Sequence, residues 1–441
     1  MNVLIMIGQL LLGLSILVIL HELGHFLAAR AFGIKVEKFY LFFDAWNFSL
    51  FKFKYKGVEY GIGWLPLGGY VKIAGMIDES MDTEQLAGPP QPWEFRSKPA
   101  WQRLIVMMAG IIVNVFLGIF IFWMLAAHYG ESYIPNQEVK YGIVPGSIGK
   151  KIGLKPGDQV YAINGKPLKK FGDLTSTNVL LDQSILDIHR GNKDTTVAIP
   201  KGILNDISDQ SLDDFISPIP RTTFHVDSIS PTAKTSGLKK GDSIIAVNHT
   251  KITYYDQVKS TLDSNKSKQV ALIVVRNNQT LNLTAQVDKD GVIGFLPHLN
   301  LPKQTNVTFS FFGSLPVGVH RAWSTLSDNF KGLGKIFKGD VKVNKAIHGP
   351  VFIATMFGGE VEWYKFWSLV GILSMVLAFT NLLPIPALDG GHSLFLLIEM
   401  IKGKPLSDKF LERAQIVGFV LLVTLMVFVF GNDTVRLIFK K

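Results

Sequence analysis

The N-terminal apolar run is the feature that most restricts the fold of this chain. Residues 3–29 are long enough to cross the roughly 30 Å hydrocarbon core of a bilayer, which takes about 20 apolar residues. The run has no basic leader of the kind that precedes a cleavable signal, so it predicts a retained transmembrane helix. His21, Glu22 and His25 interrupt it. Because such side chains are costly in lipid and face the protein interior, the run predicts a membrane helix with a functional polar face.

Three further apolar runs, at 103–127, 364–384 and 414–431, complete a predicted set of four transmembrane helices. The second run contains Asn114 and the third contains Asn381, and buried polar groups of this kind are functional candidates. The fourth run is almost uniformly apolar and is expected to be a plain anchor. The predicted fold class is therefore a multi-pass α-helical membrane protein.

The composition excludes several functions and kinds of site. The net charge is +10, but the basic residues lie beside the apolar runs and form no basic–aromatic stripe, so they indicate membrane orientation and not nucleic-acid binding. The sequence contains no cysteine, which excludes disulfides, zinc ribbons and thiol catalysis. Any metal site must therefore use His, Asp or Glu.

The basic clusters predict an orientation. Arg30, Lys35 and Lys38 follow the first helix, which places the N-terminus outside and residues 31–100 on the cytoplasmic side. Residues 128–363 then lie outside, and the basic loop at 402–413 returns to the cytoplasmic side. His21 and His25 lie near the end of the first helix that faces the cytoplasm, so water is expected to reach them from that side.

Residues 31–100 are too apolar for an ordinary loop. The stretch 47–73 alternates apolar and polar residues with the period of strands, and glycines such as Gly68 and Gly69 supply turns. Irregular backbone at membrane depth must be covered by protein or line a cavity. We expect membrane-associated β-hairpins beside the first helix.

The outside segment contains an internal repeat. Residues 147–165 and 231–249 both carry small residues, then G-L-K-x-G-D, then an alternating strand and an Asn turn. Two copies in the same order predict a duplicated module, at 139–200 and 222–298, with a linker near 200–222. Residues 308–350 have helical amphipathic spacing and fit either a helix at the bilayer surface or an ordinary linker helix.

The motif H-E-x-x-H carries the predicted chemistry. On a helix it places His21 and His25 one turn apart on one face, where both imidazoles can bind one cation. Glu22 lies one position around the helix, close to the metal but not bound to it, and can transfer protons. Two nitrogens and a carboxylate suit one Zn²⁺ with a fourth position open for water. A buried polar cluster that only joins helices is the alternative interpretation.

The third predicted ligand comes from "TNLLPIPALDGGH" at 380–392, which ends the third apolar run. Pro384 and Pro386 break the helix and expose backbone and carboxylate groups. Asp389 is the natural carboxylate ligand, although in a soluble protein it would read as a turn residue. His392 is expected to stay outside the ligand set.

HELGH in a first membrane helix, N-x-x-P-x-P-x-L-D-G-G in a late one, and tandem outside modules resemble the site-2 protease family of intramembrane zinc metalloproteases. The resemblance covers essentially the whole chain. It implies that His21, His25 and Asp389 bind zinc, that Glu22 is catalytic, and that Asn381 helps to hold substrate. One departure is Ile111, where the family commonly has proline after Ala-Gly, and it leaves the role of Asn114 open.

The same resemblance implies further expectations. "GIGWLPLGGYVKI" at 61–73 is similar to the family's re-entrant β-loop, so the expected substrate contacts include Gly68, Gly69, Tyr70, Pro384 and Pro386. The duplicated modules look like PDZ domains, which accept extended peptides. The expected protein is a monomer in the bacterial inner membrane that cuts single-span membrane proteins during regulated intramembrane proteolysis, including trimmed anti-sigma factors and signal-peptide remnants.

Two other functions fit parts of the sequence. A membrane scaffold would bind peptides through PDZ-like modules and carry an inactive metal site, but it would not need the unligated acid Glu22. A metal transporter would spread metal-binding residues over several helices, and the fourth apolar run contains none.

Overall fold

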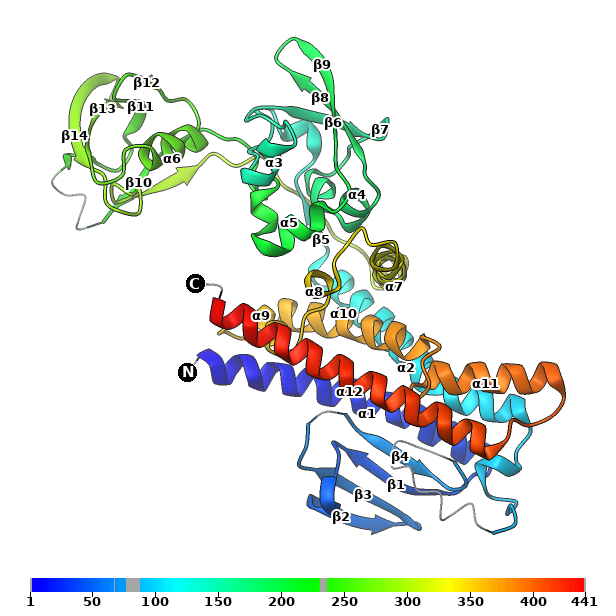
Figure 1. Ribbon diagram of the computed structural model, residues 1–441. Helices are drawn as coiled ribbons and strands as arrows, with labels where there is room; N and C mark the ends of the chain where they lie inside the picture. The colour runs from blue at the N-terminus through cyan, green and yellow to red at the C-terminus, as the bar shows by residue number, and fades with distance from the viewer. Residues whose placement is uncertain (1, 67, 77–87, 231–235, 440–441) are drawn as a thin grey trace. The chain divides into compact units, whose positions relative to one another are not determined.

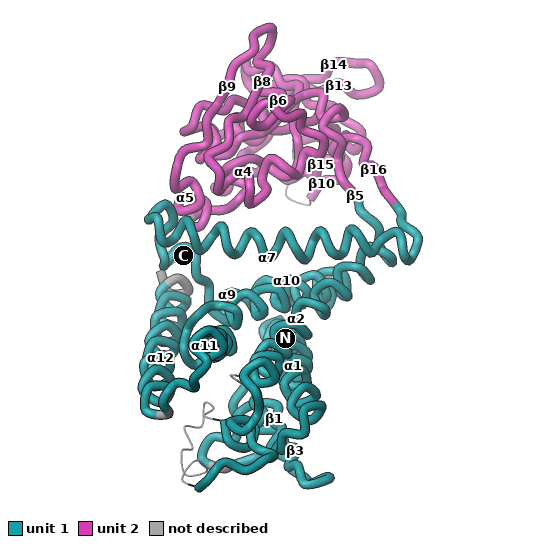
Figure 2. The backbone as a smooth tube through the Cα atoms, turned by 90° about the vertical axis from the view of Figure 1, so that its right-hand side faces the viewer, with its two compact units in different colours: residues 1–131, 308–441 teal, residues 132–307 magenta. Residues whose placement is uncertain are grey.

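The computed structural model describes residues 2–66, 68–76, 88–230 and 236–439. Within the predicted β region, residues 77–87 lie outside the described residues, and so do residues 231–235 at the start of the second repeat. The chain forms two compact units, residues 1–131 with 308–441, and residues 132–307 (Figure 2). Each unit is considered by itself.

Four long helices dominate the first unit and contain segments long and apolar enough to cross a membrane, as predicted. They are α1 (Asn2–Ala31), α2 (Ala100–Tyr129), α10 (Trp363–Leu382) and α12 (Asp408–Phe439). Helix α2 packs against both α1 and α10. A Cβ on Gly24 of α1 would lie 2.6 Å from the carbonyl oxygen of Ala109, so the missing side chain lets α1 and α2 approach closely.

The segment 363–392, expected to hold the third membrane helix together with the L-D-G-G motif, forms two separate helices. Helix α10 ends at Leu382, and a separate helix, α11 (Asp389–Lys402), begins at Asp389. Pro384 and Pro386 lie between them, because proline cannot donate to the helical ladder and its ring crowds the preceding turn. Helix α11 has 14 residues, about 21 Å of helix at 1.5 Å per residue, which is too short to span the bilayer.

The fourth membrane helix is more than the plain anchor we expected. Gln415 and Asp433 of α12 are buried. The Asp433 carboxylate accepts hydrogen bonds from the backbone N–H groups of Gly349 (2.9 Å) and Phe352 (3.2 Å) at the start of α9 (Pro350–Phe357). The first N–H groups of a helix have no partner within it, so a carboxylate there is stabilising. Asp433 therefore ties α12 to the segment that precedes α10.

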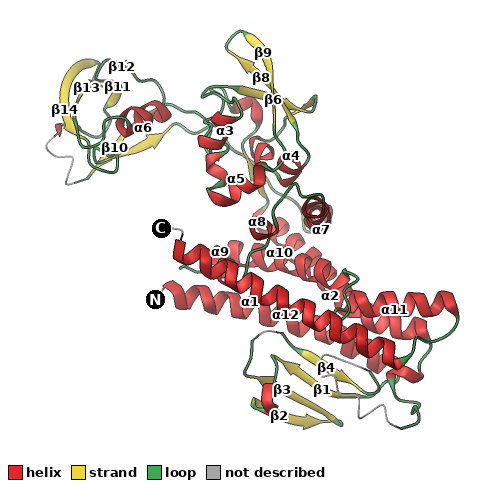
Figure 3. Cartoon of the chain, viewed as in Figure 1, coloured by secondary structure: helices red, strands yellow, loops and turns green. Residues whose placement is uncertain are grey.

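The predicted β region forms a four-stranded sheet beside α1 (Figures 1 and 3). Its strands are β1 (Val36–Leu41), β2 (Ser49–Tyr55), β3 (Val58–Gly63) and β4 (Tyr70–Ile73), in the order β2-β3-β1-β4. Strand β1 is parallel to β3 and antiparallel to β4. Buried side chains join the sheet to α1 and α2, among them Ala29, Ile34, Val36 and Met107. Strand β4 is consequently an edge strand next to the helices.

The amphipathic region contains α7 (Leu315–Phe337) and α8 (Val343–Ala346). Helix α7 packs across α2 and α10 (Figure 2). A Cβ on Gly318 would lie 2.6 Å from the backbone nitrogen of Trp123, so glycine allows this crossing. Exposed aromatic side chains such as Trp323 and Phe337 remain on α7. The packing is compatible with both interpretations of this segment.

The second unit contains two four-stranded sheets of the same topology, β7-β6-β8-β9 and β12-β11-β13-β14. The first consists of β6 (Gln159–Ile163), β7 (Lys166–Pro167), β8 (Ile185–Arg190) and β9 (Lys193–Ala198). The second consists of β11 (Ser243–Val247), β12 (Thr250–Lys251), β13 (Gln269–Arg276) and β14 (Gln279–Gln286). The accompanying helices are α3 (Ser147–Lys151), α4 (Thr177–Leu181), α5 (Ile203–Asp209) and α6 (Tyr255–Asp263).

Two short ladders complete this unit: β10 (Phe224–Ile229) pairs with β15 (Phe295–Leu299), and β5 (Glu131–Tyr133) pairs with β16 (Thr305–Val307). The second ladder joins the segments through which the chain enters and leaves the unit. Ser132 donates a hydrogen bond of 3.0 Å to Gln304 across it.

The G-L-K-x-G-D motif builds the same polar network in each copy. In the first, Asp158 accepts a hydrogen bond from the backbone N–H of Lys155 and pairs with Arg190 at 2.8 Å. In the second, Asp242 accepts from the backbone of Lys239 and pairs with Arg276 at 2.7 Å. The aspartate thus closes the turn that leads into the following strand.

The predicted linker at 200–222 is wrong for most of its length. Ile203, Phe215 and Ile216 are buried in the core of the first module, which also contains α5. Apolar side chains in this segment complete a core that the strands alone leave open. The first module therefore continues to about the "SPIP" sequence at 217–220.

Candidate metal centre

Helix α1 presents His21 and His25 on one face, one turn apart. Both residues are buried, with 7% and 6% of their surface exposed. Their Nε2 atoms lie 3.3 Å apart. The surrounding apolar residues make the helix, and the four-residue spacing gives the two rings a common direction.

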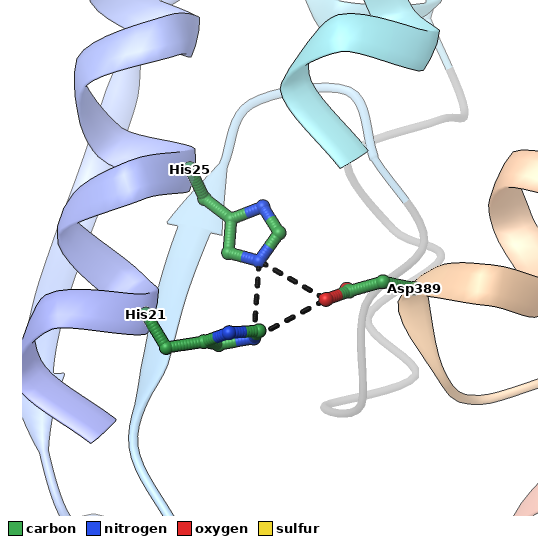
Figure 4. Close-up of side chains that lie close together, drawn as sticks. All are labelled: His21, His25 and Asp389. Atoms are coloured by element: carbon green, nitrogen blue, oxygen red, sulfur yellow. Dashed lines mark hydrogen bonds and ion pairs between the residues drawn. The ribbon is translucent and has the colours of Figure 1, made fainter. Parts of the chain in front are cut away.

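Asp389 reaches the same point from the first residue of α11. Its Oδ2 atom lies 3.2 Å from Nε2 of His21 and 3.3 Å from Nε2 of His25 (Figure 4). The irregular segment after α10 turns the chain so that the carboxylate points at α1. The predicted contact between the first helix and the L-D-G-G motif is therefore present.

These atoms fit a zinc ion. Tetrahedral ligands at the usual zinc distance of about 2.0–2.1 Å lie roughly 3.3 Å from one another, and the three observed separations are 3.2, 3.3 and 3.3 Å. Two imidazoles and one carboxylate leave a fourth position open, as in catalytic zinc sites. Among the described residues, His21, His25 and Asp389 form the one group with such spacing.

Helix α2 supports the ligands from behind. Nδ1 of His25 lies 2.8 Å from the carbonyl oxygen of Val106, a bond in which the ring must donate. The proton on Nδ1 leaves the lone pair of Nε2 free for a metal. A Cβ on Gly110 would lie 2.3 Å from Nε2 of His25 and 2.6 Å from Cε1 of His21, so only glycine gives both rings room.

A cavity of about 210 Å³ opens beside the cluster, and Glu22 lines it. Val71 and Ile73 of the edge strand β4 line another part of the wall, with Gly68 and Gly69 before them. A Cβ on Gly69 would lie 2.6 Å from Val18 of α1, which explains how the loop lies so close to the helix. The cavity thus brings together an acid, a ligand cluster and a strand edge.

The predicted substrate contacts divide into two groups. Asn381 lines the cavity with its amide nitrogen 3.2 Å from Nε2 of His21, and Gly68 and Gly69 also line it. Tyr70, Pro384 and Pro386 are not among the described residues that line it. The Tyr70 hydroxyl instead donates a hydrogen bond of 2.8 Å to Asp44. Side chains alternate along β4, so Tyr70 faces away from the cavity when Val71 faces it. The two prolines lie in the turn between α10 and α11.

Sequence reasoning missed the contribution of α12. Gln415 lines the cavity, and a Cβ on Gly418 would lie 1.7 Å from the carbonyl oxygen of Pro386. The two residues share one helical face because they are three positions apart. The sequence signal that could have indicated this contact is a polar residue and a glycine three positions apart in an apolar run. His392, which we expected outside the ligand set, lines the cavity and is not in the metal-spaced group.

Four membrane-length helices and a His-His-Asp cluster with two buried histidines, beside a glutamate outside the ligand group, define a membrane metalloprotease. The chain belongs to peptidase family M50, whose model matches residues 9–425. This assignment confirms the predicted resemblance to the site-2 protease family. The protein is therefore a metalloendopeptidase of the site-2 protease type.

Similar proteins match over nearly their whole length. The chain is 30% identical over 461 residues to a putative zinc metalloprotease of Vibrio cholerae, covering 97% of this chain and 98% of that protein. It is 29% identical over 459 residues to the regulator of sigma E protease of Haemophilus influenzae, with 98% and 99% covered. The corresponding protein of Escherichia coli is 28% identical over 464 residues, with 98% of each chain covered.

Proposed function

We propose that this protein is a zinc-dependent intramembrane endopeptidase that hydrolyses peptide bonds within transmembrane segments of single-span membrane proteins. The observation that carries the proposal is the position of Glu22, which lines the same cavity as His21, His25 and Asp389. A purely structural metal site needs the ligands but has no use for an acid beside its open position.

The three ligands would hold one zinc ion, which supplies Lewis-acid chemistry that polarises a carbonyl and makes water more acidic. Glu22 accepts a proton from the attacking water. As the C–N bond breaks, Glu22 returns that proton to the leaving amine, so the water is divided between the two products. Asn381, with its amide nitrogen in the cavity, donates a hydrogen bond to the substrate backbone.

Strand β4 would hold the substrate in an extended form. A peptide bond inside a transmembrane helix is already hydrogen-bonded, so the substrate must unwind locally before it is cut. An edge strand has one side that no other strand of its sheet pairs with, and an unwound segment can add there. Val71 and Ile73 of this edge line the cavity, so an added strand would pass beside Glu22.

The absence of cysteine from the natural sequence makes this contact testable by crosslinking. Val71→Cys should form a disulfide with a cysteine near the scissile bond of a bound substrate. Tyr55→Cys, on the opposite edge of the sheet, is the matched control and should not crosslink. Equal crosslinking from both edges would contradict the proposed path.

The modules of the second unit would act as PDZ-like domains outside the bacterial inner membrane, with the active site toward the cytoplasm. Their repeated strand order and the basic residues that follow α1 support this arrangement. We infer that they exclude substrates whose outer domain is still attached. Because β5 and β16 bring the ends of the unit together, residues 139–298 can be deleted with little strain, and the deletion should release cleavage of untrimmed substrates. A deletion variant that still requires trimming would refute the filter.

The central experiment is Glu22→Gln in proteoliposomes that contain a single-span substrate. The variant should retain zinc and lose cleavage, while Glu412→Gln, at an exposed position of α12, should behave like the natural protein. Cleavage at the natural rate by zinc-loaded Glu22→Gln would contradict the proposed role of Glu22, whereas a zinc-loaded natural protein that cuts no substrate would favour an inactive scaffold.

A further inference from the structure

Asn114 is a fully buried amide in the middle of α2, with 0% of its surface exposed. Its Nδ2 atom lies 3.0 Å from Nδ1 of His21. Its Oδ1 atom is buried and has no hydrogen-bond partner among the residues that the structure describes. A buried amide oxygen without a partner is costly, so this side chain requires an explanation.

The backbone of Asn114 is held in place. Its carbonyl oxygen accepts a hydrogen bond of 2.8 Å from the hydroxyl of Ser374, which is fully buried on α10. Val106, Gly110 and Asn114 follow one another at intervals of four and share one face of α2. Along this face, Val106 bonds His25, Gly110 gives room to both rings, and Asn114 meets His21.

The chemistry of imidazole determines what His21 needs from Asn114. A neutral ring carries one proton, so a ring that binds a metal through Nε2 must carry its proton on Nδ1 and needs an acceptor there. Val106 supplies that acceptor for His25. The partner at Nδ1 of His21 is Asn114, and the atom that faces it is the amide nitrogen, a donor.

A half-turn of the amide resolves both mismatches. The two ends of a carboxamide have nearly the same size, so the turn places Oδ1 where Nδ2 lies and requires no other movement. The oxygen without a partner then accepts the Nδ1–H of His21. The lone pair of Nε2 is directed at the point shared with His25 and Asp389.

We propose that Asn114 is a positioning residue that selects the tautomer of His21: its amide oxygen accepts the Nδ1 proton and holds the ring in the form that binds zinc. This inference rests on the proposed function, since it assumes that zinc is the cation bound. It assigns α2 a part in the metal centre that the ligand motifs on α1 and α11 do not reveal.

The test measures zinc affinity by chelator competition on the full-length protein in detergent, independently of cleavage. Asn114→Leu, which keeps the size but removes the acceptor, should weaken zinc binding about 10- to 100-fold. Asn114→Asp, which can only accept, should retain binding within a few-fold. A donor role predicts instead that the Asp and Leu variants lose zinc alike, and simple packing predicts that the Leu variant, which keeps the size, binds zinc as the natural protein does.

Gln9→Leu is the matched control. Gln9 is also a buried membrane amide. Its nitrogen donates hydrogen bonds to the carbonyls of Gly358 (3.1 Å) and Glu360 (3.4 Å), and its oxygen has no partner among the described residues. It lies outside the ligand cluster, so its loss should lower the unfolding temperature and leave zinc affinity unchanged. Equal loss of zinc affinity in Gln9→Leu and Asn114→Leu would overturn the proposal.

A second measurement holds even if the Asn114 variants do not fold. Nitrogen-15 NMR of the histidine side chains in the zinc-loaded natural protein should find the proton of His21 on Nδ1, and a proton on Nε2 would refute the inference. Failure of the proposed function looks different, because the zinc-loaded natural protein would then cleave no substrate.

Discussion

Oδ2 of Asp389 lies 3.2 Å from Nε2 of His21, although the two residues come from opposite ends of the chain. The contact depends on the break after Leu382 and on the close packing of α1 against α2. A functional centre assembled in this way is sensitive to changes that alter helix spacing and leave the ligands themselves intact.

Replacement of Gly110 by alanine tests that sensitivity. The new Cβ would lie 2.3 Å from Nε2 of His25, so a ligand ring or α2 must move. Zinc affinity should fall about 10-fold or more, as when the support of a ligand is lost. Gly8→Ala on α1 meets no atom within 4 Å and is the control. Unchanged zinc affinity in Gly110→Ala would show that the rings have more room than the structure indicates.

Removal of the carboxylate ligand separates metal binding from proton transfer. Asp389→Ala leaves two histidines, which are too few for a zinc site, so the purified protein should contain little zinc and cleave nothing. Glu22→Gln should lack activity and keep its zinc. Metal analysis of both variants checks the assignment, which would be wrong if Asp389→Ala retained stoichiometric zinc.

The contact between α12 and the proline segment predicts that the same substitution in α12 lowers the cleavage rate at one glycine and not at another. Gly418→Val would place side-chain atoms where the carbonyl of Pro386 lies, since even a Cβ would approach it to 1.7 Å. The shift should displace the turn that carries Asp389 and lower kcat at least about 10-fold, because small misplacements of catalytic groups are costly. A Cβ on Gly431 meets no atom within 4 Å, so the Gly431→Val variant should cleave normally. Comparable rates for both variants would contradict this packing.

The Asp242–Arg276 pair predicts how the second module responds to mutation. The Asp242 side chain is fully buried, so Asp242→Ala leaves Arg276 without its carboxylate partner and should destabilise this module by about 3 kcal/mol. Hydrogen exchange of residues 236–299 in the full-length protein measures the loss. The exposed Asp227–Lys240 pair is the control, and Asp227→Ala should leave exchange unchanged.

The same pair predicts an acid transition. Burial works against ionisation, but the Arg276 guanidinium holds the pKa of Asp242 below its usual range. Because the folded pKa is lower than the unfolded value of about 3.9, the stabilisation is present above that pH and is lost as pH falls through the folded-state pKa. Exchange protection of the module should therefore decrease in acid, and Asp242→Ala should remove most of this pH dependence.

Much of the centre could be predicted because its parts are local patterns. The spacing of His21 and His25 follows from helix geometry, and the cost of polar groups in lipid marks them as functional. Asp389 was recognisable because the adjacent prolines break an apolar run. Tyr70 shows the limit of such reasoning. Successive residues of a strand point to opposite faces, and the register of β4 decided that Val71 and not Tyr70 lines the cavity.

The sequence by itself determined the membrane helices, the two local ligand motifs and the repeated turn, because each depends on periodicity or on residues close together in the chain. Only the tertiary structure decided that α2 supplies Val106, Gly110 and Asn114 to the histidines, and that α12 brings Gln415 to the cavity. Those contacts depend on how one helix is rotated against another. Packing of side chains across helices sets that rotation, and no pattern within a single helix specifies its partner.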